Sequence, residues 1–271
     1  MKGDNKNMID IDGITISFDD FGKSDIPIIF IHGFPFDKSS WQPQMKFLKK
    51  THRVIAYDIR GFGASISNDE PESIYLFSND LVKFMDALAI KKAIVCGLSM
   101  GGYILLNAVH RFPNRFEAIV LSDTQCIADS EEAKEKRSKS ISQIKAEGLK
   151  KFADTFIANV FCQNSLDNKK ELVEEIRNII LKTPQRTVIG TLEALAQRSE
   201  MCASLHEISV PTLILCGNED IVTPPIQAEL LYGKILNSSL HIIQNAGHLA
   251  NLEQPEQFNK HLTSFISSLT K

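Results

Sequence analysis

Ser99 stands in the segment Gly97-Leu98-Ser99-Met100-Gly101, between a short apolar run and an amphipathic one. The Gly-x-Ser-x-Gly spacing is typical of a buried strand that turns sharply into a helix, with the serine at the corner. Such a turn strains the serine backbone and leaves no space for side chains two residues away, where glycine fits. It also raises the serine hydroxyl above the sheet. Ser99 is therefore predicted to be the nucleophile of an acyl transfer.

A serine nucleophile needs a histidine base, because an isolated hydroxyl is too weak an acid to attack at neutral pH. Among the seven histidines, His248 lies between the last predicted strand and the last predicted helix, so that its loop shares a sheet edge with Ser99. His32 also follows a predicted strand. The other five are interpreted as solvated or packed residues: His52, His110, His206, His241 and His261. His248 is the predicted base.

Asp220 is the predicted carboxylate partner of His248. It follows the predicted strand 212–216 through a polar turn, and it produces the chain order serine, aspartate, histidine. Two alternatives stay open. Asp123 ends the preceding predicted strand, and Glu219 is adjacent to Asp220.

The elements that must position these residues alternate between strands and helices, which indicates an α/β fold with a mostly parallel sheet and helices on both faces. An N-terminal hairpin at 9–21 is expected at an antiparallel edge of the sheet. The predicted strands are 26–31, 53–57, 93–96, 118–121, 212–216 and 240–243, and the predicted helices are 39–49, 73–88, 100–112, 225–236 and 255–269.

Residues 124–210 break this alternation. They contain no convincing buried strand but carry apolar residues at helical spacing, which predicts a helical cap over the carboxyl ends of the strands. Residues 1–123 and 211–271 would then form the core domain. Four apolar residues of the cap are candidates to face the pocket: Phe152, Phe156, Phe161 and Leu195.

Composition allows one large core, since the 271 residues are 43% hydrophobic. The net charge of -3 and the absence of a basic run argue against nucleic acid and anionic membranes as partners. A start without a signal-like apolar segment, and the lack of a membrane-length apolar stretch, predict a cytoplasmic protein. The five cysteines show no C-x-x-C pair and are expected to be small buried thiols in reducing surroundings: Cys96, Cys126, Cys162, Cys202 and Cys216.

Four blocks of the chain together resemble the α/β-hydrolase family, and the resemblance covers nearly the whole chain. They are His32-Gly33-Phe34-Pro35, Asp58 to Ser65, Gly97 to Gly102, and Asp220 with Gly247-His248. Within the family the chain looks most like the small capped hydrolases that include 3-oxoadipate enol-lactonases and haloperoxidase-type esterases. This resemblance implies an eight-stranded α/β-hydrolase sheet with a helical cap insertion.

The resemblance also implies an oxyanion hole made of two backbone amides. Family position points to the Phe34 amide, and the Met100 amide lies at the N-terminus of the helix that follows Ser99. The resemblance further implies a structural role for His32 and a packing role for Trp41. The block from Asp58 to Gly63 is interpreted as a structural turn rather than a cofactor site.

These observations predict a serine hydrolase that acts on a small carboxylic ester or lactone and uses water, with no cofactor and no metal. No P-loop or zinc-binding array is present, and a serine rather than an aspartate occupies position 99. A perhydrolase or haloperoxidase, a carbon–carbon bond hydrolase and a non-catalytic small-molecule receptor remain alternatives. Phe34, Phe152 and Phe156 are the predicted substrate contacts. An enol-lactonase would also need a cation for its substrate carboxylate, for which the cap offers Arg137, Arg177, Arg186 and Arg198.

Overall fold

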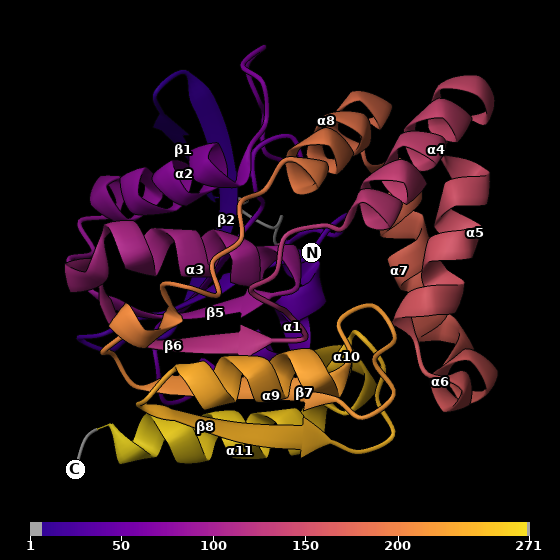
Figure 1. Ribbon diagram of the computed structural model, residues 1–271. Coiled ribbons are helices and arrows are strands. Elements are labelled where there is room, and N and C mark those ends of the chain that lie inside the picture. The colour runs from indigo at the N-terminus through magenta and orange to yellow at the C-terminus, as the bar shows by residue number, and fades with distance from the viewer. Residues whose placement is uncertain (1–6, 270–271) are drawn as a thin grey trace, which may run out of the picture.

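A single eight-stranded sheet organises the protein, whose computed structural model describes residues 7–269 (Figure 1). The strands are β1 (Asn7–Ile11), β2 (Ile14–Phe21), β3 (Ile28–Ile31), β4 (Val54–Tyr57), β5 (Ala93–Leu98), β6 (Phe116–Ser122), β7 (Thr212–Gly217) and β8 (Ser238–Ile243). Their order is β1-β2-β4-β3-β5-β6-β7-β8. β2 pairs antiparallel with β1 and β4, and every other pair is parallel. The predicted sheet and its N-terminal hairpin are thus confirmed.

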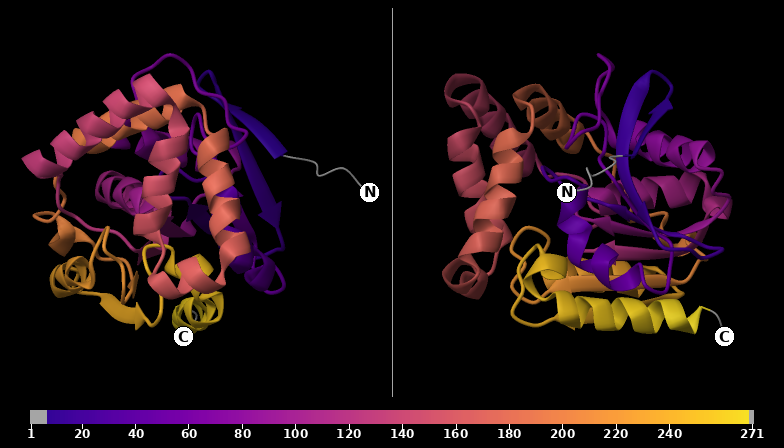
Figure 2. Two further views of the ribbon diagram at one scale, coloured as in Figure 1. Left: turned by 90° about the vertical axis from the view of Figure 1, so that its right-hand side faces the viewer. Right: turned by 180° about the vertical axis from the view of Figure 1, so that it is seen from behind.

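Helices cover both faces of this sheet, which explains why its inner strands are apolar throughout. All four residues of β3, Ile-Ile-Phe-Ile, are buried, as expected for a strand covered on two sides. The core helices are α1 (Gln42–Leu48), α2 (Ile74–Ala87), α3 (Met100–Arg111), α9 (Pro225–Lys234), α10 (Ala250–Glu253) and α11 (Pro255–Ser268). α2 packs beside α3 and α1 beside α11, and these pairs lie on opposite faces (Figures 1 and 2).

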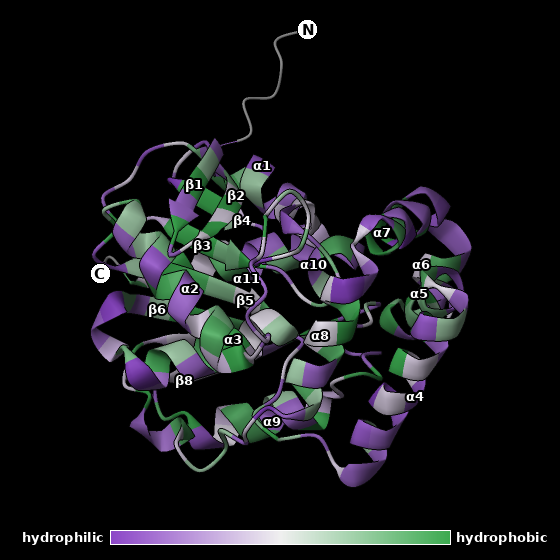
Figure 3. Ribbon diagram, turned by 90° about the horizontal axis from the view of Figure 1, so that it is seen from above, coloured by the Kyte–Doolittle hydropathy of each residue, from purple (hydrophilic) through white to green (hydrophobic). Residues whose placement is uncertain are grey.

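The cap is helical, as predicted, and lies beyond the carboxyl ends of the strands (Figure 2). It comprises α4 (Glu131–Glu147), α5 (Leu149–Val160), α6 (Gln163–Asn168), α7 (Lys170–Lys182) and α8 (Gln185–Ala196). α4 contacts both α5 and α8. Figure 3 shows hydrophilic residues along α4. Ile144 is the only buried residue of this helix. The division into domains at residues 123 and 211 stays a prediction.

One expectation about the cysteines is wrong, because Cys126 and Cys202 form a disulfide. The two residues are 76 positions apart in the chain, and they meet because the cap begins and ends at the same place on the core. The Met201 N–H donates to the Cys126 carbonyl there (2.8 Å). Disulfides persist in oxidising surroundings, so the expected reducing surroundings are not supported by this pair. The other three cysteines are buried free thiols: Cys96, Cys162 and Cys216.

Candidate active site

Ser99 lies at the corner between β5 and α3 with φ 52° and ψ -112°. Positive φ is rare for a residue with a side chain and marks backbone strain. A Cβ added at Gly97 would lie 2.4 Å from the Gly101 carbonyl oxygen, and one at Gly101 would lie 2.5 Å from the Ile31 carbonyl oxygen. The two glycines therefore let strand and helix approach closely enough to hold the serine in this conformation.

The structure brings Ser99, His248 and Asp220 together from three separate loops. His248 Nε2 lies 2.8 Å from Ser99 Oγ, and His248 Nδ1 lies 2.8 Å from Asp220 Oδ2. All three residues are buried. A neutral imidazole that donates from Nδ1 to the carboxylate presents Nε2 as an acceptor to the serine hydroxyl. An imidazole in this position is able to take a proton from the serine hydroxyl.

Asp220 is fixed by its own turn. The N–H groups of Val222 and Thr223 donate to Oδ1 (2.8 and 3.0 Å), and the Thr223 hydroxyl donates to Oδ2 (2.7 Å). Thr223 was not predicted from the sequence. A signal was present, because an aspartate side chain in a turn commonly bonds to backbone groups that follow it, and Thr223 comes three residues after Asp220.

The alternative carboxylates have other partners. Asp123 accepts from the Gly217 N–H (2.8 Å) and from the Ser122 hydroxyl (2.7 Å), and Glu219 is exposed. Ligating atoms of Asp123, Cys216 and Asp220 lie within 4.8 Å of one another, a grouping that could hold a metal ion. Hydrogen bonds to the protein already account for these groups, and we propose no metal there.

Burial and charge act in opposite directions on the central pair. Burial lowers the pKa of His248, but the carboxylate of Asp220 outweighs it, and the pKa is raised above its ordinary value. Burial raises the pKa of Asp220, yet the charge and hydrogen bond of His248 leave it lowered. For Asp123, burial and the neighbouring Asp220 both raise the pKa well above its usual range. The site thus favours a negative Asp220 beside an imidazole that accepts a proton readily.

Two backbone segments approach Ser99 where an oxyanion would form. Met100 is the first residue of α3, so its N–H lies at a helix N-terminus. Gly33 lies against Ser99, because a Cβ added there would be 3.3 Å from the Ser99 Cβ. Phe34 follows directly, and the oxyanion roles of its amide and of the Met100 amide stay predictions.

His32 and Trp41 are buried and make structural contacts. His32 is fully buried; Nδ1 is 2.8 Å from the Gly33 carbonyl, and Nε2 accepts from the Ile59 N–H (3.0 Å). It therefore joins the loops that follow β3 and β4. Trp41 is buried against Phe30, with ring centroids 4.8 Å apart.

The block from Asp58 to Gly63 is a hydrogen-bonded turn. Asp58 forms an ion pair with Lys38 (2.8 Å), and Arg60 forms a buried one with Asp80 (2.6 Å). A Cβ added at Gly63 would lie 2.4 Å from the Asp58 carboxylate. These contacts fit the structural interpretation of the block.

The predicted substrate contacts form one aromatic cluster, which comprises Phe34, Phe152 and Phe156. The Phe34 ring centroid lies 6.2 Å from that of Phe152 and 6.0 Å from that of Phe156, and the latter two are 5.6 Å apart. The cluster joins α5 of the cap to the loop that passes Ser99. Phe161 and Leu195 are also buried, but the backbone of Phe161 lies against Gly247.

The cap arginines all have carboxylate partners. Arg137 and Arg198 pair with Asp129, Arg177 pairs with Asp154, and Arg186 pairs with Asp69, at 2.5 to 2.7 Å. For Asp129, burial raises the pKa, but the two arginines outweigh it and leave the pKa lowered. Each arginine therefore already has an acidic partner, although Arg137 and Arg198 share one carboxylate.

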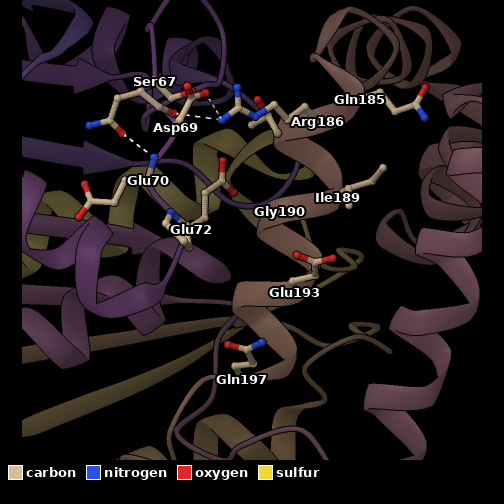
Figure 4. Close-up of a pocket in the computed structure, with 13 residues that line it drawn as sticks. Ser67, Asp69, Glu70, Glu72, Gln185, Arg186, Ile189, Gly190, Glu193 and Gln197 are labelled. Atoms are coloured by element: carbon tan, nitrogen blue, oxygen red, sulfur yellow. Dashed lines mark hydrogen bonds and ion pairs between the residues drawn. The ribbon is translucent and has the colours of Figure 1, made fainter.

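A cavity of about 530 Å³ lies between α8 and residues 67–72 (Figure 4). Asp69, Glu72 and Arg186 are among its lining residues, and none of the lining residues is Ser99, His248 or Asp220. Burial raises the pKa of Glu72 to about 7, although the Thr191 hydroxyl donates to this carboxylate and lowers it. The cavity thus lies at the boundary between α8 and the core, where Thr191 and Glu72 are in direct contact.

Comparisons with known proteins agree with this geometry. The family model of the α/β hydrolase fold matches residues 26–255. The chain belongs to the α/β-hydrolase fold family. Two similar relatives in Acinetobacter baylyi are named 3-oxoadipate enol-lactonase 2 and 3-oxoadipate enol-lactonase 1. They are 29% and 30% identical over 94% and 95% of both chains.

A solved structure is similar throughout. A thermophilic esterase from Thermogutta terrifontis, described as malate bound, superposes with a TM-score of 0.92 at 31% identity and covers 98% of both chains. The resemblance stated from the sequence motifs is confirmed at the level of the family. This α/β hydrolase is accordingly an enzyme of the carboxylic ester hydrolase type.

Proposed function

We propose that the protein is a serine hydrolase of small carboxylic esters or lactones that works through an acyl-enzyme. One observation carries the proposal: Ser99 Oγ, His248 and Asp220 form a continuous chain in which both hydrogen-bond distances are 2.8 Å. Relatives named as enol-lactonases and a similar structure described as an esterase support it. No cofactor enters the proposed reaction.

The reaction has two halves. His248 Nε2 takes the hydroxyl proton as Ser99 Oγ attacks the carbonyl carbon, while Asp220 stabilises the imidazolium. The Phe34 and Met100 amides donate to the oxyanion. The C–O bond then breaks, and the leaving alcohol takes the proton from Nε2. Water then attacks the acyl-enzyme with the same histidine as base, the bond between the acyl carbon and Ser99 Oγ breaks, and Nε2 returns the proton to Oγ. In a lactone the leaving oxygen stays attached to the acyl group.

We infer that the acyl group lies against the aromatic cluster of Phe34, Phe152 and Phe156. Aromatic rings favour apolar groups, and an anionic group buried among them without a cation would lose its hydration. The four cap arginines already have carboxylate partners. This supports an uncharged acyl group over one that carries a second carboxylate.

Hydrolysis of p-nitrophenyl esters by the wild type and by Ser99→Ala tests both inferences. We expect turnover of the acetate and butyrate that is lost in the variant. Turnover that is equal in the variant would remove Ser99 as the nucleophile. The esters p-nitrophenyl butyrate and mono-p-nitrophenyl succinate are a matched pair that differs by a terminal carboxylate. Preference for the succinate would contradict the inference of an uncharged acyl group and would leave Ser99 as the nucleophile.

A cytoplasmic location stays a proposal. Within residues 7–269, no helix is long and apolar enough to cross a membrane. The Cys126–Cys202 disulfide argues in the other direction, because the cytoplasm of most organisms keeps thiols reduced. Acid quenching of cells, followed by alkylation under denaturing conditions and mass spectrometry, tests the proposal: alkylated Cys126 and Cys202 support it, and a pair that stays disulfide-bonded contradicts it.

A further inference from the structure

Glu253 is a fully buried carboxylate at the end of α10 that the proposed reaction does not use. Its Oε1 accepts from the Gly247 N–H (2.7 Å), and its Oε2 accepts from the Cys162 N–H (2.9 Å). Acceptance at both oxygens is the pattern of an ionised carboxylate. A buried charge is unfavourable unless hydrogen-bond donors stabilise it, and these two N–H groups do so here.

The two N–H groups belong to different parts of the molecule. Gly247 directly precedes His248, whereas Cys162 follows the C-terminal end of α5 in the cap. The two segments are in direct contact, because a Cβ added at Gly247 would lie 2.7 Å from the Cys162 nitrogen. The His248 N–H itself donates to the Val160 carbonyl (2.8 Å). The histidine loop is therefore joined to the cap through Glu253 and through the backbone.

We propose that Glu253 is a positioning residue, which holds the His248 loop against the end of α5 and so keeps the imidazole in line with Ser99. This inference rests on the proposed function, in which His248 is the general base. Without the carboxylate, the N–H groups of Gly247 and Cys162 would be buried without this acceptor, and the loop would shift to find others. A displacement of about 1 Å at a reacting group can lower the rate about 100-fold.

The charge of Glu253 adds a second effect that can be measured. His248 faces three carboxylates from three elements: Asp220 after β7, Asp123 after β6, and Glu253 in α10. Burial lowers the pKa of His248, and the negative charges of Asp220 and Glu253 raise it. Lys169 Nζ donates to the backbone carbonyl of Glu253 and leaves both carboxylate oxygens to the two N–H groups. Removal of the Glu253 charge should therefore lower the pKa of His248.

The test compares Glu253→Gln with Glu256→Gln, a matched change at an exposed position three residues further on. Glutamine has nearly the same shape but carries no charge, and its NH₂ group would face one of the two N–H donors. We measure kcat/KM for p-nitrophenyl acetate between pH 5 and 9, with circular dichroism to report the folded fraction. For Glu253→Gln we expect kcat/KM to fall by about 10- to 100-fold per folded molecule. The acid limb of its pH profile of kcat/KM should also move to lower pH. Glu256→Gln should match the wild type in both rate and pH profile.

A folded Glu253→Gln variant with the wild-type rate and wild-type acid limb would overturn the proposal. The proposal would also be overturned if the loss of rate were fully explained by a smaller folded fraction and the acid limb of the pH profile did not move. If Glu253→Gln does not fold, Glu253→Asp keeps the charge but is too short to reach both N–H groups. It should lower the rate with the acid limb near the wild-type position, and a wild-type rate would overturn the proposal. Ser99→Ala, run in parallel, shows separately whether the proposed function itself fails.

Discussion

Ser99 has a strained backbone conformation that its surroundings must hold. A non-glycine residue at positive φ is unfavourable by about 1–3 kcal/mol. Here the Ser99 N–H donates to the Ser122 carbonyl (2.9 Å), and the Thr124 hydroxyl donates to the Ser99 carbonyl (2.8 Å). These two bonds come from β6 and the residues after it. The strained residue is thus held from the neighbouring strand, and its side chain is left free for His248.

At the same scale, Asp220→Asn should lower kcat for p-nitrophenyl acetate by about 10⁴-fold, because asparagine no longer holds the imidazole tautomer or stabilises the imidazolium. Steady-state kinetics at pH 8 measure the effect. Glu219→Gln is the matched control, since it removes an adjacent exposed carboxylate. An Asp220→Asn variant with near wild-type turnover would favour another carboxylate as the partner of His248.

The sequence alone was enough to predict the location of those site residues that a single short segment places in the fold. Ser99 lies at a glycine-flanked turn, and His248 and Asp220 directly follow strands whose carboxyl ends meet at one edge of the sheet. Glu253 could not be found in this way, because Cys162, one of its two partners, is 91 residues away in the chain. The short helix α10 that carries Glu253 was missed too, since the helix predicted nearby began at Pro255.

Helix α8 of the cap contacts Glu72, an ionisable group of the core. A Cβ added at Gly190 would lie 3.2 Å from the Glu72 carboxylate, and the Thr191 hydroxyl donates to it. Thr187 Oγ1 donates to the Gly61 carbonyl (3.1 Å), which adds a second contact between α8 and the core. The state of Glu72 should therefore affect how firmly this helix packs.

The pH dependence of this contact has a defined sign. The pKa of Glu72 rises from 4.5 to about 7 on folding, so the folded state binds its proton more tightly. The contribution of the protonated Glu72 to the free energy of unfolding is fully present below about pH 4.5 and is lost as the pH rises through about 7. Glu72→Gln should therefore increase the free energy of unfolding at pH 8 by about 1–2 kcal/mol, with solvent screening allowed for. The difference should disappear near pH 4.5.

Urea denaturation of the wild type and Glu72→Gln at several pH values measures this difference. Glu256→Gln is the control, because Glu256 is exposed and is not among the charges that act on Glu72. Parallel stability profiles for the wild type and Glu72→Gln across this pH range would contradict the prediction.

At the scale of the whole molecule, the cap is a long insertion that leaves the sheet after β6 and returns before β7. Its two ends meet at the Cys126–Cys202 disulfide, and its middle meets the histidine loop at Val160 and Cys162. The strand order and parallel register of β6 and β7 are those of direct neighbours. The core sheet is therefore continuous beneath the insertion.

Replacement of both Cys126 and Cys202 by serine should lower the free energy of unfolding by about 2–4 kcal/mol, because the crosslink restricts a long loop in the unfolded chain. Urea denaturation with and without dithiothreitol measures this. The reductant should destabilise the wild type and leave the double variant unchanged. Equal stability of all four samples would show that the crosslink contributes nothing.

The narrow base of the cap also makes this part of the chain exchangeable. The Cα atoms of Cys126 and Cys202 are 4.9 Å apart, a spacing that facing residues of adjacent antiparallel strands also have. A segment of different length could be grafted between these two points without moving β6 or β7. To preserve the histidine loop it would have to supply a carbonyl for His248 and an N–H for Glu253. Specificity could thus diverge through recombination of caps while the hydrolytic machinery beneath stayed unchanged.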